Sequence, residues 1–133
     1  MFGDTATCTY LLQEQFANGL KRIRGALEGA HFAVAGELDL SGRMRRKLGV
    51  GLPPCLVLFA APREWMGAQG AGDPTLDLLL PIHVVVAAAG FHTEVHFLRS
   101  LPRTESGTSR VVSDLQATVS RAIEKIGMRK LED

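Results

Sequence analysis

The chain has 133 residues, of which 46% are hydrophobic and 22% charged, and its formal net charge is +1 with histidine neutral. These values are typical of one globular domain, covering residues 1–133 with a polar tail at 128–133, that folds without disulfide staples. The near-zero charge gives no overall reason to expect nucleic acid or an anionic membrane as a partner.

Cysteine usage and the hydropathy pattern bear on where the protein resides. Cys8 and Cys55 show no paired spacing, so neither a disulfide framework nor a thiolate zinc site is expected. The start of the chain shows no secretory signal pattern, and the most apolar stretch, 76–91, is interrupted by polar residues and a proline. We therefore expect a cytoplasmic protein without a membrane partner.

The first half of the chain alternates between strand and helix patterns. Residues 5–12 suit a strand, and apolar residues then recur at helical spacing until Gly29. Residues 31–40 alternate as a half-buried strand, with Phe32, Val34 and Leu38 expected on one face. Ser41 is a candidate cap for a short helix that ends at residue 48.

The second half predicts three further strands and a final helix. Residues 55–61 form a continuous apolar run typical of a central strand, and residues 62–80 suggest a short helical turn and a loop. Strands 82–88 and 91–98 are separated by Ala89-Gly90, and Thr108 or Ser109 can cap a helix that extends to Ile126. The predicted fold is a two-layer α+β arrangement, with both long helices on one face of a mainly antiparallel sheet.

Several short motifs occur in an order that resembles the bacterial "domain of unknown function 302" family. They are Gly36-Glu37-Leu38-Asp39, Gly49-Val50-Gly51-Leu52-Pro53-Pro54, Ala61-Pro62, Asp73-Pro74, and Leu78-Leu79-Leu80-Pro81 before Val84-Val85-Val86. The resemblance extends from the first helix to the last. It implies a TATA-binding-protein-like order of strand, helix, four strands and helix, frequent homodimers and no established activity, and the fold name does not imply DNA binding.

Two positions depart from the pattern that this resemblance implies. Family members often carry Cys-Asn where this chain has Ala60-Ala61, and many carry a cysteine where this chain has Ile82. Redox or metal chemistry that depends on those cysteines is therefore not available to this protein.

Histidines placed on the predicted hairpin are the main candidate site. A two-residue turn at Ala89-Gly90 would pair His83 with His96, and a four-residue loop would give the same pairing, whereas a three-residue loop would place Phe97 opposite His83. In the first register the polar side chains share the sheet face that the helices leave open. These side chains are His83, His92, Glu94 and His96.

These residues suit two kinds of site. His83, His96 and Glu94 form a His-His-carboxylate set that would suit zinc or a similar metal, whereas His92 is too far along the strand to share it. With His92 and with Trp65 of the 62–80 loop, the same residues would line a ligand-binding surface. The competing interpretation is a wet sheet face or a dimer seam, and no second shell of supporting groups is evident.

Three functions compete on this basis. The leading one is a homodimeric binding or accessory module that uses the open sheet face and the 62–80 loop to hold a small ligand or a partner. The sequence assigns no catalytic residue and predicts no cofactor other than the metal of the alternative, a metal-binding protein or metal-dependent enzyme. A nucleic-acid role comes third, and it would depend on a basic cluster at Arg43, Arg45, Arg46 and Lys47.

Overall fold

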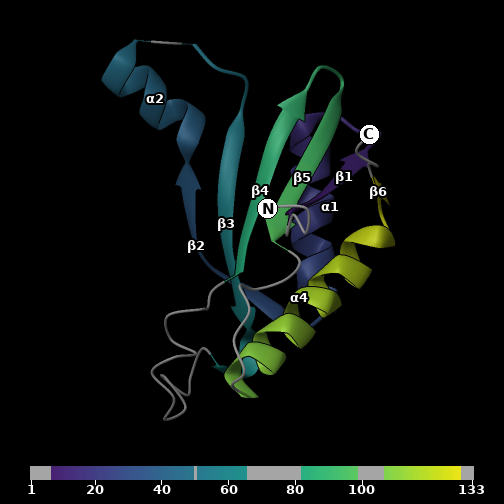
Figure 1. The fold of residues 1–133 in the computed structure, drawn as a ribbon. Coiled ribbons are helices and arrows are strands. Elements are labelled where there is room, and N and C mark those ends of the chain that lie inside the picture. The colour runs from purple at the N-terminus through teal and green to yellow at the C-terminus, as the bar shows by residue number, and fades with distance from the viewer. Residues whose placement is uncertain (1–6, 50, 66–81, 99–106, 130–133) are drawn as a thin grey trace, which may run out of the picture.

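The computed structural model describes residues 7–49, 51–65, 82–98 and 107–129 and shows a two-layer α+β fold (Figure 1). Its strands form one antiparallel sheet in the order β2-β3-β4-β5-β1-β6. The strands are β1 (Thr7–Leu12), β2 (Phe32–Asp39), β3 (Cys55–Pro62), β4 (Ile82–Ala89), β5 (His92–Leu98) and β6 (Met128–Arg129). The predicted fold class and element order are confirmed, and β6 is an addition to them.

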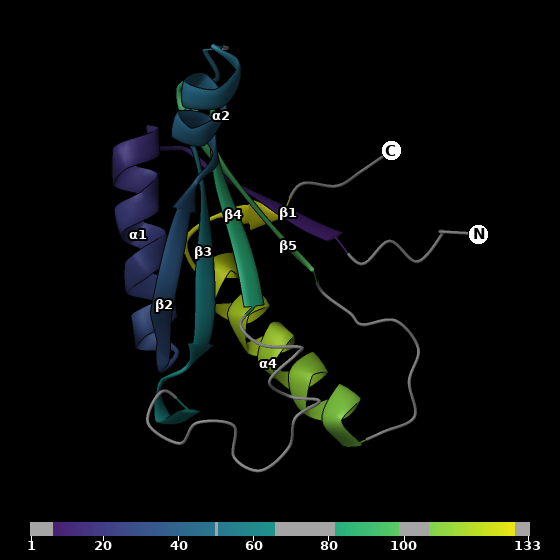
Figure 2. The ribbon, with the colours of Figure 1, turned by 90° about the vertical axis from the view of Figure 1, so that its left-hand side faces the viewer.

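Two long helices, α1 (Phe16–Gly29) and α4 (Gly107–Glu124), pack against the same face of this sheet. The shorter helix α2 (Leu40–Leu48) follows β2 and lies beyond the strand ends (Figure 2). Within the described residues, no helix is both long and apolar enough to cross a lipid bilayer.

The hydrophobic core lies between the sheet and the two long helices. Each helix contributes an apolar stripe, with Ile23 and Leu27 from α1 and Val119 and Ile123 from α4, and all four side chains are fully buried. The strands contribute every second residue, because successive side chains point to opposite faces. The buried strand residues of this cluster are Cys8, Tyr10, Leu12, Phe32, Leu58, Ala60, Ile82, Val84, Val86, Val95 and Phe97.

A buried tyrosine of β1 links the sheet to α4 through hydrogen bonds. The hydroxyl of Tyr10 donates to Glu124 Oε2 at 2.8 Å and lies 2.6 Å from Ser120 Oγ, and its ring stacks on Phe97 with centroids 5.8 Å apart. Because the phenol has one proton, the Ser120 hydroxyl donates to the phenol oxygen when Glu124 accepts from it. Burial raises the pKa of Tyr10, since the low-polarity surroundings disfavour the phenolate.

A bulge in β2 changes which side chains face the helices. Val34 pairs with Ala60, whereas the next pair along the strand is Gly36 with Phe59, so Ala35 is left without a partner on β3. The extra residue reverses the alternation, and Leu38 therefore lies on the face away from the helices. The prediction that Leu38 shares a face with Phe32 and Val34 is wrong for this reason.

The same reversal gives the acidic residues of β2 structural partners. Glu37 now lies on the helix side, where it forms an ion pair with Arg24 of α1, and this partner lowers the pKa of Glu37. Asp39 caps α2 by accepting from the Gly42 backbone N–H at 2.9 Å, and the Ser41 hydroxyl donates to the same carboxylate. Ser41 was the predicted cap, so the cap lies two residues earlier than predicted.

Helix α1 lies close to β5 at Gly19. A Cβ atom added there would lie 2.4 Å from Thr93 Oγ1, and Thr93 is fixed because its hydroxyl donates to the Glu14 carbonyl at 2.8 Å. Gly25, in the same helix, has no atom within 4 Å of its added Cβ. The two glycines therefore differ in what a side chain would meet.

We expect Gly19→Ala to lower the free energy of unfolding by about 1–3 kcal/mol, because the methyl group must displace Thr93 or the helix. In contrast, Gly25→Ala should raise it by about 0.5–1 kcal/mol, because alanine is the better helix former at an open position. Urea denaturation of both variants measures the two changes. Equal effects of the two substitutions would show that the contact between α1 and β5 is looser than described.

Candidate functional site on the uncovered sheet face

The register of the β4–β5 hairpin decides which polar side chains meet. The turn residues are Gly90 and Phe91, with Gly90 at φ 65°, and Val85 is the residue opposite His96. Glycine with positive φ at the first position of a two-residue loop suits a hairpin turn. The predicted direct pairing of His83 with His96 is therefore wrong, and Phe91, predicted as the first residue of a strand, lies in the turn and is 78% exposed.

The register differs from the predicted one by two positions, so every side chain keeps its predicted face. His83, Glu94 and His96 all lie on the face away from α1 and α4, which we call the uncovered face because neither long helix packs on it. Val84 and Val95 lie on the opposite face and are fully buried. The prediction that these polar residues share the open face is confirmed.

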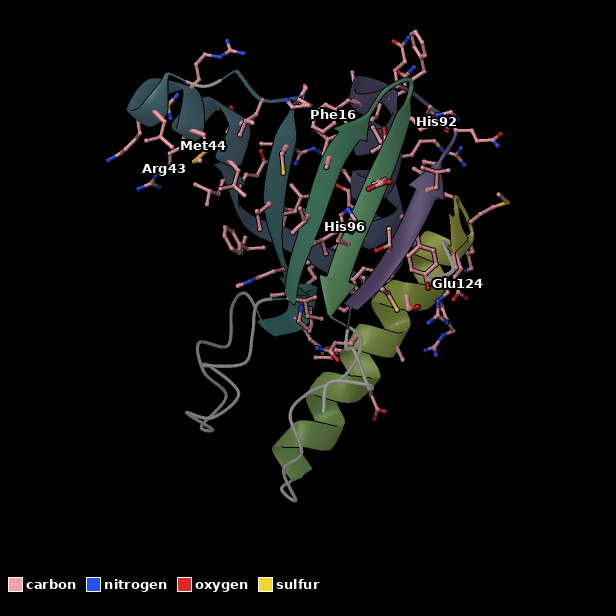
Figure 3. All side chains as sticks on the ribbon, turned by 45° about the horizontal axis from the view of Figure 1, so that its top comes forward. Phe16, Arg43, Met44, His92, His96 and Glu124 are labelled. Carbon is pink, nitrogen blue, oxygen red and sulfur yellow. The ribbon has the colours of Figure 1, made fainter. Side chains whose placement is uncertain are left out.

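His96 is held by partners at both ring nitrogens. Thr9 Oγ1 of β1 lies 3.0 Å from Nδ1, and Glu94 Oε1 lies 3.2 Å from Nε2. A carboxylate can only accept, so in a neutral imidazole Nε2 carries the proton and Nδ1 accepts from the Thr9 hydroxyl. The two contacts orient the ring of His96, which is labelled in Figure 3.

A hydroxyl, an imidazole and a carboxylate in this order are also the parts of an activated nucleophile. Thr9, however, is only 9% exposed, so its oxygen offers little surface to a substrate. The accessible part of the network is the edge shared by His96 and Glu94. That edge can accept or donate hydrogen bonds to a bound molecule.

His83 lies apart from this network. It is opposite Phe59 of β3, and the two rings meet edge to face with centroids 5.0 Å apart and planes at 84°. Among the residues that the structure describes, no group of three His, Cys, Asp or Glu side chains is arranged to hold a metal. The structure thus brings Glu94 and His96 together and does not add His83 to them.

An apolar strip lies beside the polar network on the uncovered face. Val57 of β3 pairs with Leu38 on one side and Val85 on the other, and it is only 8% exposed although it lies on the face away from the helices. Phe59 and Ala87 extend the strip along β3 and β4 and are half-buried. Val85 joins the strip to the polar network, because it is opposite His96.

The remaining predicted site residues are spread over the molecule. His92 is exposed at the start of β5, and Trp65 ends a 3-10 turn, η1 (Arg63–Trp65), with its side chain outside the described part of the chain. Residues 66–81, which make up most of the predicted binding loop, also lie outside the described residues. The basic cluster lies on α2, with its four cationic side chains exposed.

Sequence reasoning missed Thr9, although one signal pointed to it. Threonine alternates with other residues at positions 5, 7 and 9, a pattern typical of the polar face of a strand. Its partner His96 is 87 positions away in the chain, so only the pairing of β1 with β5 reveals the contact.

We predict that neutral His96 is present as the Nε2–H tautomer, with Nδ1 as the acceptor. Long-range proton–nitrogen NMR correlations of the imidazole distinguish the two tautomers, and the exposed ring of His92 serves as an internal control. Thr9→Val should leave Nδ1 without its donor and cost about 1 kcal/mol of stability. A proton on Nδ1 in the unmodified protein would contradict the described network.

The comparisons with known proteins agree with this fold. A crystal structure of an uncharacterised conserved DUF302 protein from Bacillus stearothermophilus superposes with a TM-score of 0.74 at 12% identity, covering 91% of this chain and 98% of that one. No curated protein matches the sequence. The model of the family described as "Domain of unknown function DUF302" matches residues 8–126, and the chain therefore belongs to this family.

Proposed function

We propose that the protein is a binding module whose ligand or partner occupies the uncovered face. One observation carries this proposal: an apolar strip centred on Val57 and Val85 adjoins the oriented edge of His96 and Glu94, on the face opposite the two long helices. Binding sites for small molecules combine a mainly apolar lining with a few well-placed polar groups. No catalytic role is assigned to any of these residues.

The arrangement suits a flat molecule with an apolar body and one polar group. The body would cover Phe59, Val85 and Ala87, which are half-buried, and burial yields about 25 cal/mol per Å² of apolar surface. The polar group would meet the edge of His96 and Glu94, whose orientation is already fixed by Thr9. The 62–80 loop remains part of the proposal as a further contact.

A second copy of the chain is the partner that we favour. An uncovered sheet face with an apolar strip can pair with itself about a twofold axis, since the same patch serves both subunits. Cys8 and Cys55 are both free thiols, and a reducing compartment such as the cytoplasm keeps thiols in that state. On these grounds we propose a cytoplasmic homodimer.

Val85→Arg should abolish self-association, because it places a charge in the middle of the strip without touching the core beneath it. Sedimentation velocity at micromolar concentration should give a dimer for the unmodified protein and a monomer for the variant. Ala17→Arg is the matched control, since Ala17 is exposed on α1, and it should remain a dimer. A monomer mass for the unmodified protein would exclude the homodimer.

The binding role has a separate test, because a monomer could still hold a small molecule. Titration with a library of aromatic fragments, followed through backbone amide NMR signals, should move the signals of Val57, Val85 and His96. Shifts confined to α1 and α4 would place the binding surface elsewhere and contradict the proposal.

Metal binding is the second candidate, and the contact between Glu94 and His96 favours it. Zinc binds histidine nitrogen and carboxylate oxygen at about 2.0–2.2 Å, so two of its ligands lie roughly as far apart as the 3.2 Å between His96 Nε2 and Glu94 Oε1. With zinc on Nε2, the proton of a neutral His96 would be on Nδ1, which would then donate to the Thr9 hydroxyl. Tetrahedral coordination would need further ligands, either from a rearranged His83 or from a second copy.

If metal is bound, purified protein should contain stoichiometric zinc that is lost in the double variant His83→Ala and His96→Ala. Metal analysis by mass spectrometry measures the content, and His92→Ala provides the matched control. Negligible zinc after dialysis against a zinc-containing buffer would exclude this alternative.

A further inference from the structure

Four large apolar side chains are exposed among the described residues, and all of them lie toward one end of the sheet. They are Leu48 (62% exposed), Leu52 (39%), Phe91 (78%) and Met128 (64%). Leu48 ends α2, Leu52 precedes β3, Phe91 lies in the β4–β5 turn, and Met128 pairs with Leu11 near the end of β1. Isolated exposed apolar residues are ordinary, whereas a group of them is typical of a contact surface.

Strand pairing shows that these elements share one end of the sheet. The chain leaves β2 for α2 after Asp39, enters β3 at Cys55 and turns from β4 to β5 after Ala89, and these strand ends are adjacent in the pairing. The Ala88 backbone N–H also donates to the Pro54 carbonyl at 2.9 Å. Figure 1 shows α2 and the β4–β5 turn at the top of the molecule. We call α2, residues 51–54 and this turn the α2 end.

The α2 end also carries a dense cluster of positive charge. Arg43, Arg45, Arg46 and Lys47 are exposed, and α2 contains no acidic residue. Within the described part of the chain, none of the four is ion-paired. Figure 3 shows Arg43 on the side of α2 away from the strands.

The apolar side of α2 continues this surface. Leu40, Met44 and Leu48 recur every four residues, so they share one side of the helix. Leu40 and Met44 are half-buried near the sheet, and exposure rises to its maximum at Leu48. The helix thus presents cations and an apolar tip together.

We propose that the α2 end docks on a bilayer surface rich in anionic lipid headgroups. The four cations would contact headgroup phosphates, while Leu48, Leu52 and Phe91 would reach the boundary of the acyl chains. This docking is peripheral and requires no membrane-spanning helix. The expectation of no membrane partner came from the hydropathy pattern, which bears on spanning segments, and from the net charge of the whole chain, which averages out a local cluster.

The combination of charge and apolar tips selects lipid over other partners. A second copy bound at this end would bring two basic clusters together, and like charges repel. Nucleic acid would use the cations and leave the apolar tips in water. An anionic bilayer satisfies both kinds of side chain at once.

Vesicle flotation tests the proposal with phosphatidylcholine alone and with an equimolar mixture of phosphatidylcholine and phosphatidylglycerol. The protein should float only with the mixed vesicles. Binding should weaken between about 0.1 M and 0.5 M salt, because added salt shortens the distance over which the charges attract one another. The double variant Arg45→Gln and Arg46→Gln should bind the mixed vesicles more weakly, by about fivefold for each charge removed. Leu48→Ser combined with Phe91→Ser should weaken it by about tenfold.

The matched control removes the same charge elsewhere, through Lys21→Gln with Lys125→Gln on the exposed sides of α1 and α4. That variant should bind as the unmodified protein does. Equal binding to neutral and mixed vesicles would overturn the proposal. Binding to duplex DNA that weakens in the Arg45 and Arg46 double variant, but not in the Leu48 and Phe91 double variant, would show that the partner is nucleic acid and not lipid. These residues lie outside the apolar strip and the polar network of the uncovered face, so either result leaves the proposed binding function untouched.

Discussion

The packing of α1 and α4 onto one face of the sheet is the constraint on which the other features depend. Two helices bury one face of the main strands, and most of the side chains that they contact are apolar. In β4 and β5 these are Val84, Val86 and Val95, all fully buried. Because neighbouring residues in a strand point to opposite faces, Val85 and His96 are forced onto the other side. The candidate site is a consequence of the core.

This constraint explains which parts of the fold could be predicted from the sequence. Helical spacing in α1 and apolar alternation in β4 and β5 depend directly on which side chains are buried. The sequence therefore predicts these helices and strands, and the sheet face on which each side chain lies. The position of the turn is different, because a shift of two residues leaves every face unchanged and costs the core nothing. Periodicity alone therefore fixed the face of His96 but not the residue opposite it.

Local backbone features were beyond the reach of the pattern. Gly36 inside the β2 pattern is a general signal of a bulge, but it does not show that Ala35 is the extra residue. This one residue moves Leu38 to the uncovered face and turns Glu37 toward Arg24. The contact between Thr9 and His96 joins residues 87 positions apart and depends on β1 lying beside β5. Such contacts depend on which strands are neighbours in the sheet, and a single sequence carries only weak signals of strand order.

The two proposed surfaces are linked through the base of α2. Asp39 caps the helix, and the Ser41 hydroxyl also accepts from the Cys55 backbone N–H at 3.2 Å, which ties the first turn of α2 to the start of β3. Gly49, in the left-handed conformation at φ 70°, ends the helix at its exposed tip. The base of α2 is therefore fixed to the strand that also carries Val57, whereas Leu48 and the cations project from it. A partner on the uncovered face and a bilayer at the α2 end would contact different side chains, so neither proposed surface uses the residues of the other.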